Sequence, residues 1–76
     1  MDTNEFIRNS AKKCGWEKYY LVLRPVGIGT QPKNGMMDFI NYNRRTEVSG
    51  RMVWAEIYYD RELTPEELRN YDMIGE

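Results

Sequence analysis

The stretch Arg51–Tyr71, RMVWAEIYYDRELTPEELRNY, constrains the fold most, because it predicts a strand that runs into a helix with almost no linker. Its first half alternates with the period of two that a pleated strand imposes. One predicted face carries Val53, Ala55, Ile57 and Tyr59, and the other carries Met52, Trp54, Glu56 and Tyr58. The first face is apolar and the second is amphipathic.

The second half of this stretch holds a helix start at residues 64–67, Thr-Pro-Glu-Glu. It places a capping hydroxyl, a proline at the first helical position and a glutamate three residues after the cap, which is a capping box. Leu63 and Leu68 flank the cap at the spacing of a hydrophobic staple. We therefore expect a helix over residues 65–73 that ends near Gly75. The residues expected to complete its contact with the sheet are Leu68, Tyr71, Met73 and Ile74.

The first third of the chain predicts a short helix and a strand. Asp2 or Thr3 can cap the helix and Gly15 can stop it, but its helix propensity is mediocre, so residues 1–15 are expected either to fray or to order on binding. Cys14, near its end, is expected to be a small buried apolar residue. A strand is predicted over residues 16–24, because Pro25 ends it.

The middle of the chain predicts a loop, a turn and one more strand. Residues 26–35 are rich in glycine, and their Asn34-Gly35 dipeptide is a tight-turn signal. A strand is predicted over residues 36–43, followed by a polar connection over residues 44–50. Gly27-Ile28-Gly29 with Lys33 fits neither spacing of the known phosphate-binding loops, and no helix signal follows it.

These elements predict one small α+β domain spanning residues 1–76. Its sheet is expected to be three-stranded and mainly antiparallel, formed by residues 16–24, 36–43 and 52–59. The C-terminal helix is expected to pack on one face, and a short N-terminal helix is expected in addition. One layer of helix would leave the other face of the sheet exposed.

The composition argues against an enzyme and against a metal or cofactor site. The chain has no histidine and one cysteine, which removes the commonest general base, the commonest metal ligand and any internal disulfide. The carboxylate pairs at Glu66-Glu67 and at Asp60 with Glu62 are better explained by helix charging and a solvated turn. No apolar run is long enough for a membrane span, and the first 15 residues lack the apolar core of a signal peptide, so a cytoplasmic protein is expected.

The net charge of −1 conceals an asymmetry between the two parts of the chain. Residues 1–51 hold nine Lys and Arg against five Asp and Glu, or +4, and residues 52–76 hold two against seven, or −5. The interpretation we adopt is favourable packing of an acidic C-terminal helix near basic strands. The alternative is a basic patch that faces a partner.

Aromatic residues interleaved with basic ones are the candidate binding constellation. Tyr, Trp and Arg dominate the hot spots of protein interfaces, and aromatics beside Arg also stack nucleotide bases. The alternative is a small core built from aromatics, with Arg stems packed over it. The candidate partner-binding residues are Trp16, Tyr20, Arg24, Tyr42, Arg44, Arg45, Trp54 and Tyr58.

Three motifs in this order resemble a group of short uncharacterised proteins of gut Firmicutes and their phages and mobile elements. They are YYLVLRP, with its strand ending in Arg-Pro, the Gly-Thr-x-Pro loop in GTQPKNG, and Tyr-Asp-Arg-x-Leu-Thr-x-Glu-Glu-Leu in WAEIYYDRELTPEELRNYDMI. The resemblance covers roughly residues 19–74 and leaves out the first helix. It implies no activity, but it suggests a mobile-element origin, where small proteins often act by binding and blocking a larger host protein.

The sequence thus predicts a small non-enzymatic binding protein, an inhibitor that sterically blocks a bacterial host protein such as a defence nuclease. Self-association is a variant of this hypothesis, since open sheet edges invite pairing between copies. The alternative is a single-stranded nucleic-acid binder, which ranks second because the acidic C-terminal part would repel phosphates. Its electrostatic half would rest on Lys18, Arg24, Lys33, Arg44, Arg45 and Arg51, and its stacking half on Trp16, Tyr20 and Tyr42.

Overall fold

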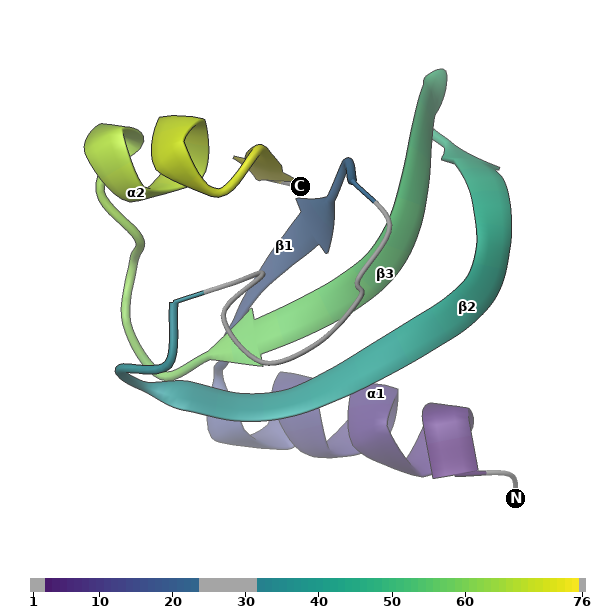
Figure 1. Cartoon of the computed structure of the whole chain (residues 1–76). Helices are drawn as coiled ribbons and strands as arrows, with labels where there is room; N and C mark the ends of the chain where they lie inside the picture. Colours follow the sequence, from purple (N-terminus) through teal and green to yellow (C-terminus); the bar gives the residue numbers. More distant parts are fainter. Residues whose placement is uncertain (1–2, 24–31, 76) are drawn as a thin grey trace.

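The computed structural model describes residues 3–23 and 32–75 and has the predicted α+β class. Its strands form one antiparallel sheet in the order β2-β3-β1-β4, with a helix on either side (Figure 1). The elements are α1 (Thr3–Cys14), β1 (Glu17–Leu21), β2 (Met36–Val48), β3 (Arg51–Tyr59), α2 (Pro65–Asn70) and β4 (Met73–Gly75).

The larger core lies between the sheet and α2. The alternation predicted for residues 52–59 is confirmed, because the apolar face of β3 points into this core and the other face points toward α1. Leu68 and Tyr71 are half-buried against the same core, as expected from the helix pattern. Its buried members are Tyr19, Leu21, Ala55, Ile57, Tyr59, Leu63 and Met73.

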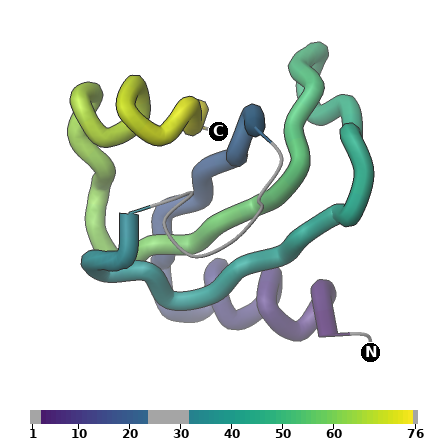
Figure 2. Tube along the Cα trace, in the orientation of Figure 1, coloured from purple at the N-terminus to yellow at the C-terminus, as the bar shows by residue number. Residues whose placement is uncertain are grey.

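A second, smaller core lies on the opposite face of the sheet, beneath α1. Ile7 and Ala11, one turn apart on α1, pack against Ile40 of β2 and Tyr58 of β3. The Cα trace in Figure 2 shows α1 and α2 on opposite sides of the sheet. The expectation that one face would stay exposed is therefore wrong, because α1 is an ordered amphipathic helix of twelve residues that covers it.

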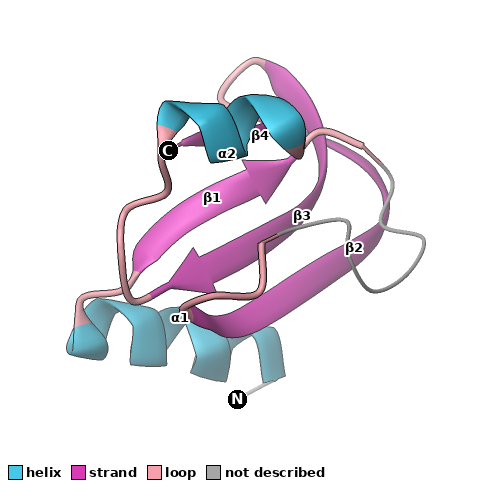
Figure 3. Ribbon diagram, turned by 60° about the vertical axis from the view of Figure 1, so that its left-hand side comes forward, coloured by secondary structure: helices cyan, strands magenta, loops and turns pink. Residues whose placement is uncertain are grey.

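The sheet has four strands rather than three, because α2 is shorter than predicted. The helix ends at Asn70, and Asp72 adopts a left-handed backbone conformation with φ of 52°, which reverses the chain. Residues 73–75 then pair with β1 as the edge strand β4, beside α2 in Figure 3. Met73 still reaches the core, but it does so from a strand.

The predicted polar connection over residues 44–50 is also wrong, because β2 continues to Val48 and forms a long hairpin with β3. Ser49 and Gly50 both have positive φ, 52° and 81°, as the two central residues of the tight hairpin turn that best matches strand twist require. A bulge between residues 41 and 46 includes Asn43 with φ of 62°. Arg44 and Arg45 lie within this irregular stretch and are exposed, which is why the sequence indicated a loop there.

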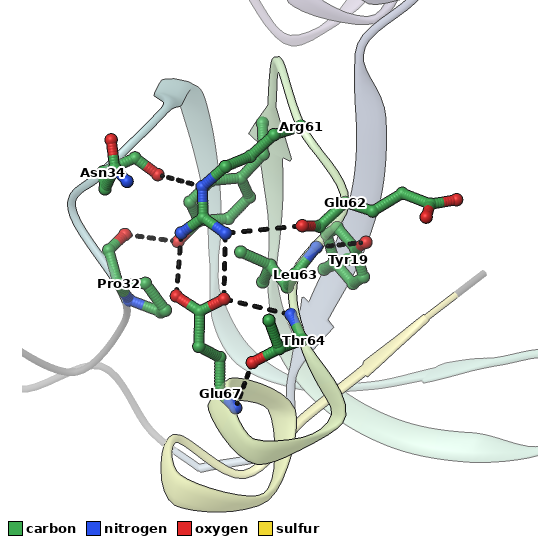
Figure 4. Close-up of polar contacts among 9 residues, drawn as sticks. Tyr19, Pro32, Asn34, Arg61, Glu62, Leu63, Thr64 and Glu67 are labelled. Atoms are coloured by element: carbon green, nitrogen blue, oxygen red, sulfur yellow. Dashed lines mark hydrogen bonds and ion pairs between the residues drawn. The ribbon is translucent and has the colours of Figure 1, made fainter.

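The predicted capping box at the start of α2 is confirmed and is part of a larger clamp (Figure 4). The Thr64 hydroxyl accepts from the Glu67 amide at 3.1 Å, and the Glu67 carboxylate accepts from the Thr64 amide at 3.0 Å. Arg61 donates two hydrogen bonds to the same carboxylate, at 2.7 and 2.8 Å, and one to the Asn34 carbonyl at 3.0 Å. The clamp thus joins the turn before β2 to the end of β3 and to α2.

Two further expectations concern the first third of the chain. Cys14 is exposed, so its expected burial is wrong. It follows Ala11 by three residues and lies near the apolar stripe of α1, but it is the last residue of the helix and is not part of the core beneath α1. The strand predicted over residues 16–24 is observed as Glu17–Leu21. Arg24 and the glycine-rich loop to residue 31 lie outside the described residues.

Candidate binding groove

A groove of about 230 Å³ lies along the junction of α1 and the sheet. It draws on three elements, the C-terminal half of α1, the start of β1 and the end of β3. We call it the α1 groove, and its lining residues are Arg8, Ala11, Lys12, Trp16, Lys18 and Tyr58.

The end of α1 places Trp16 beside this groove. Gly15 has φ of 71°, the left-handed conformation that ends many helices, and the Trp16 amide donates to the Ala11 carbonyl at 3.0 Å. This bond folds the chain back on the helix, so the indole lies half-buried against the Tyr58 ring, with ring centroids 6.4 Å apart. The two rings form the apolar part of the groove.

Glu56 of β3 is a buried carboxylate that ties α1 to the sheet beneath the groove. It is 3% exposed and accepts hydrogen bonds from Arg8 at 2.5 and 3.2 Å and from the Tyr42 and Tyr58 hydroxyls at 2.6 Å. The Lys18 ammonium lies 3.7 Å away. Burial alone would raise the pKa of Glu56, but the bonds from Arg8, Tyr42 and Tyr58 and the charge of Lys18 outweigh it and hold the pKa at about 2.

The tyrosines around Glu56 remain protonated donors. Burial first, and then the hydrogen bond to Glu56, raise the pKa of both Tyr42 and Tyr58 well above the usual tyrosine range. The Lys18 ammonium lies 5.7 Å from the Tyr20 ring centroid and 5.9 Å from that of Tyr58, within the range of cation–π attraction. Arg8, Tyr42 and Tyr58 thus all keep their protons at neutral pH when they donate to the Glu56 carboxylate.

The charges that line the groove leave it positive. Arg8 and Lys18 both lie against Glu56, and Lys12 follows Arg8 by one turn on the same face of α1. Three cations against one buried carboxylate attract an anionic group to the groove. Aromatic rings beside these cations add an apolar contact surface.

The structure brings together only some of the predicted partner-binding residues. Trp16 and Tyr58 line the groove, although Tyr58 is 2% exposed and contributes mainly to its wall. Tyr20 is buried and Tyr42 is half-buried, and both share the sheet face of Glu56. Trp54 is half-buried on β3, Arg44 and Arg45 are exposed within the bulge of β2, and Arg24 lies outside the described residues.

Arg8, Ala11 and Lys12 were not predicted as site residues. Their signal in the sequence is two pairs four apart, Ile7 with Ala11 and Arg8 with Lys12, which give α1 an apolar stripe and a neighbouring basic one. The poor helix propensity of this segment argued against using the pattern. Propensity is a weak guide here, because tertiary packing on the sheet stabilises α1.

A second hollow, of about 400 Å³, lies between the β2–β3 hairpin turn and β4. Among the described residues, Arg51 is the one charged residue that lines it. It lacks the combination of several cations and aromatic rings that distinguishes the α1 groove. Its lining residues are Tyr20, Val48, Ser49, Arg51, Ile74 and Gly75.

The described parts of the chain show neither a metal-binding cluster nor a membrane-spanning helix. Within residues 3–23 and 32–75, no group of three or more His, Cys, Asp or Glu side chains is placed to hold a metal ion. Neither of the helices described there is long and apolar enough to cross a membrane.

The fold and the groove define the class of the protein, a small α+β domain with a cationic and aromatic surface groove. Residues 15–75 match the family described as Defence against restriction A C-terminal, DarA_C, and the chain belongs to this family. The match includes all four strands and α2 but not α1, so the groove combines Trp16, Lys18 and Tyr58 of the family segment with α1 residues outside it. No curated protein and no solved structure matches the chain.

Proposed function

We propose that this chain is a phage or mobile-element protein that counters restriction in the bacterial cytoplasm by binding a protein of the host restriction system and blocking it sterically. The observation that carries the proposal is membership of the DarA_C family, whose description names defence against restriction. The resemblance of the motifs to proteins of phages and mobile elements supports the same origin.

The state of Glu56 supports binding rather than catalysis. A carboxylate that transfers protons near neutral pH needs a pKa close to that pH. Glu56 is held at a pKa of about 2 and is surrounded by donors that anchor α1 to the sheet. Its environment is that of a structural ion pair.

A protein partner is favoured over nucleic acid by where the aromatic residues lie. A stacking platform needs an open ring face, but of the three rings predicted to stack, Tyr20 is buried and Trp16 and Tyr42 are half-buried. The exposed Arg44 and Arg45 lie on the part of β2 nearer Val53, away from the groove beside Tyr58. Aromatic and basic residues thus do not form one continuous track for a strand.

Self-association through the long edge strand is disfavoured by its irregularity. β2 pairs with β3 on one side, and its register shifts between residues 36 and 38 and again between residues 41 and 46. Bulges of this kind protect edge strands against pairing with another copy. The partner we propose is therefore a different protein.

The proposal is tested by plating unmodified phage on bacteria that carry one restriction system and express this chain. Systems of different types are compared, with the same phage grown in a modifying host as the control, because modified DNA is not restricted. We expect the chain to raise the plating of unmodified phage on at least one system and to leave modified phage unchanged. Equal plating with and without the folded chain on every system would contradict the proposal.

A further inference from the structure

We infer that the α1 groove binds a short peptide segment of a protein partner, in which a carboxylate side chain lies beside an apolar one. The inference deepens the proposed function and rests on it for the class of the partner. In the bound segment, the carboxylate would lie beside the basic residues of the groove, Arg8, Lys12 and Lys18, and the apolar side chain would contact Trp16.

The size of the groove favours a side-chain anchor. Sites that enclose a drug-sized ligand measure about 300–1,000 Å³. The α1 groove, at about 230 Å³, is smaller and is formed on the surface between a helix and a sheet. One or two side chains of a bound segment fit this volume, whereas a nucleotide with its base and phosphate exceeds it.

The charges select a carboxylate and identify the residue that meets it. Arg8 and Lys18 are already held by Glu56, at 2.5 and 3.7 Å. Lys12 is exposed on the rim, and within the described part of the chain it takes part in no ion pair. An incoming carboxylate therefore gains most from Lys12, with Arg8 and Lys18 adding longer-range attraction.

The aromatic wall selects the apolar neighbour of that carboxylate. Trp16 is half-buried and lines the groove beside Tyr58, so the exposed part of its indole offers an apolar contact to an aliphatic or aromatic side chain. Trp is enriched among the residues that anchor protein interfaces. The hydrogen bond from Trp16 to Ala11 and the Glu56 network fix both walls before binding, which lowers the entropy cost of association.

The test is a nuclear magnetic resonance titration of the isotope-labelled chain with two pools of blocked pentapeptides. In the acidic pool a Glu or Asp is flanked by Leu, Ile or Phe, and in the matched pool each carboxylate is replaced by its amide. We expect saturable shifts of the Trp16 indole and of the Lys12 and Lys18 amides with the acidic pool and much weaker ones with the amide pool. Equal shifts with both pools, or none at the groove, would overturn the inference.

Two variants with the same change of charge sharpen this test. Lys12 lines the groove, whereas its exposed neighbour Lys13 does not. Lys12→Glu is expected to weaken binding of the acidic pool about fivefold or more, because an attractive charge becomes repulsive, and Lys13→Glu to weaken it far less. Equal weakening by both would mean that only net charge matters and would overturn the inference.

The Lys12→Glu and Lys13→Glu variants also distinguish failure of the groove inference from failure of the proposed function. If the wild-type chain protects phage and Lys12→Glu protects as well as Lys13→Glu does, the groove inference is wrong and the proposed function stands. If the acidic pool binds at the groove but the wild-type chain protects against no restriction system, the proposed function is wrong and the groove stands as a carboxylate site.

Discussion

Glu56 is the residue on which the attachment of α1 depends. A carboxylate that is 3% exposed costs free energy unless its charge is compensated, and here Arg8 reaches it from the helix while Tyr42, Tyr58 and Lys18 reach it from the sheet. The same contacts hold two of the three groove cations in place. Removing this one charge should therefore affect both stability and the groove.

Replacing Glu56 with glutamine is expected to lower the free energy of unfolding at neutral pH by about 2–3 kcal/mol, because Arg8 and Lys18 lose their counter-ion. The wild-type protein should also lose stability as the pH falls. The folded-state pKa of Glu56 is depressed from 4.5 to about 2, so its contribution, on the order of 3 kcal/mol, is present above the unfolded pKa and is lost between about pH 5 and pH 2.

Urea denaturation of both proteins from neutral to acidic pH checks this prediction. The pKa of Glu67 is also held at about 2, chiefly by the hydrogen bonds from Arg61, but Glu67 contributes equally to both proteins. The difference between the two pH profiles therefore isolates Glu56. Parallel profiles would show that its charge does not stabilise the fold.

Gly35 and Gly50 form a matched pair for measuring steric restriction at a turn. Both have φ of 81°, a conformation that side chains rarely adopt. A Cβ at Gly35 would lie 2.6 Å from an Asp60 carboxylate oxygen and 3.2 Å from Cγ of Arg61, whereas a Cβ at Gly50 would meet nothing within 4 Å. The guanidinium of Arg61 is bonded to Glu67, so that side chain cannot move away freely.

We therefore expect Gly50→Ala to destabilise the protein by about 1 kcal/mol and Gly35→Ala by about 1 kcal/mol more. Thermal unfolding of the two variants under the same conditions measures the difference. If Gly50→Ala were as costly as Gly35→Ala, the backbone strain alone would account for both and the contact with Arg61 would have no energetic role.

At the scale of elements, α2 is short and depends on its first turn. Its six residues have no fully buried member, so the capping box and the Arg61 clamp fix where it starts. Thr64→Ala is expected to cost about 1 kcal/mol, and Thr64→Ser, which keeps the hydroxyl, much less. Chemical denaturation of the two variants tests this, and equal losses would assign the effect to the Thr64 methyl group.

The same elements show what could be predicted from the sequence. The alternation in β3 and the capping box were readable because strand period and cap chemistry are local. β4 was not, because residues 73–75 become a strand only when Asp72 turns the chain and β1 offers a partner. The end of β2 was missed for the same reason, since pairing with β3 overrides the polar character of residues 44–48.

The candidate site was predictable only in part. Trp16 and Tyr58 were named from their residue types, and they do line one groove. Arg8 and Lys12 reach it only because α1 packs on the sheet, and that packing depends on Glu56, which is 48 residues from Arg8 in the sequence. Contacts over such a separation leave no local pattern.

In the whole molecule, helices cover both faces of one sheet, and a surface groove lies at the junction of one helix layer with the sheet. This α1 groove joins the DarA_C segment to a helix outside it. A protein that acts by occupying its target through such a surface must be present in numbers comparable to the target. An enzyme that modified the target or the DNA would not need to be.

Steric blocking of a restriction protein is tested by a cleavage assay with a purified restriction enzyme against which the chain protects phage. Increasing amounts of the chain are added to a fixed amount of enzyme, and the initial rate of cleavage of unmodified DNA is measured. We expect inhibition to rise in proportion to the molar ratio of chain to enzyme and to be relieved when the chain is removed. Complete inhibition with far fewer chains than enzyme molecules, or inhibition that persists after the chain is removed, would contradict steric blocking.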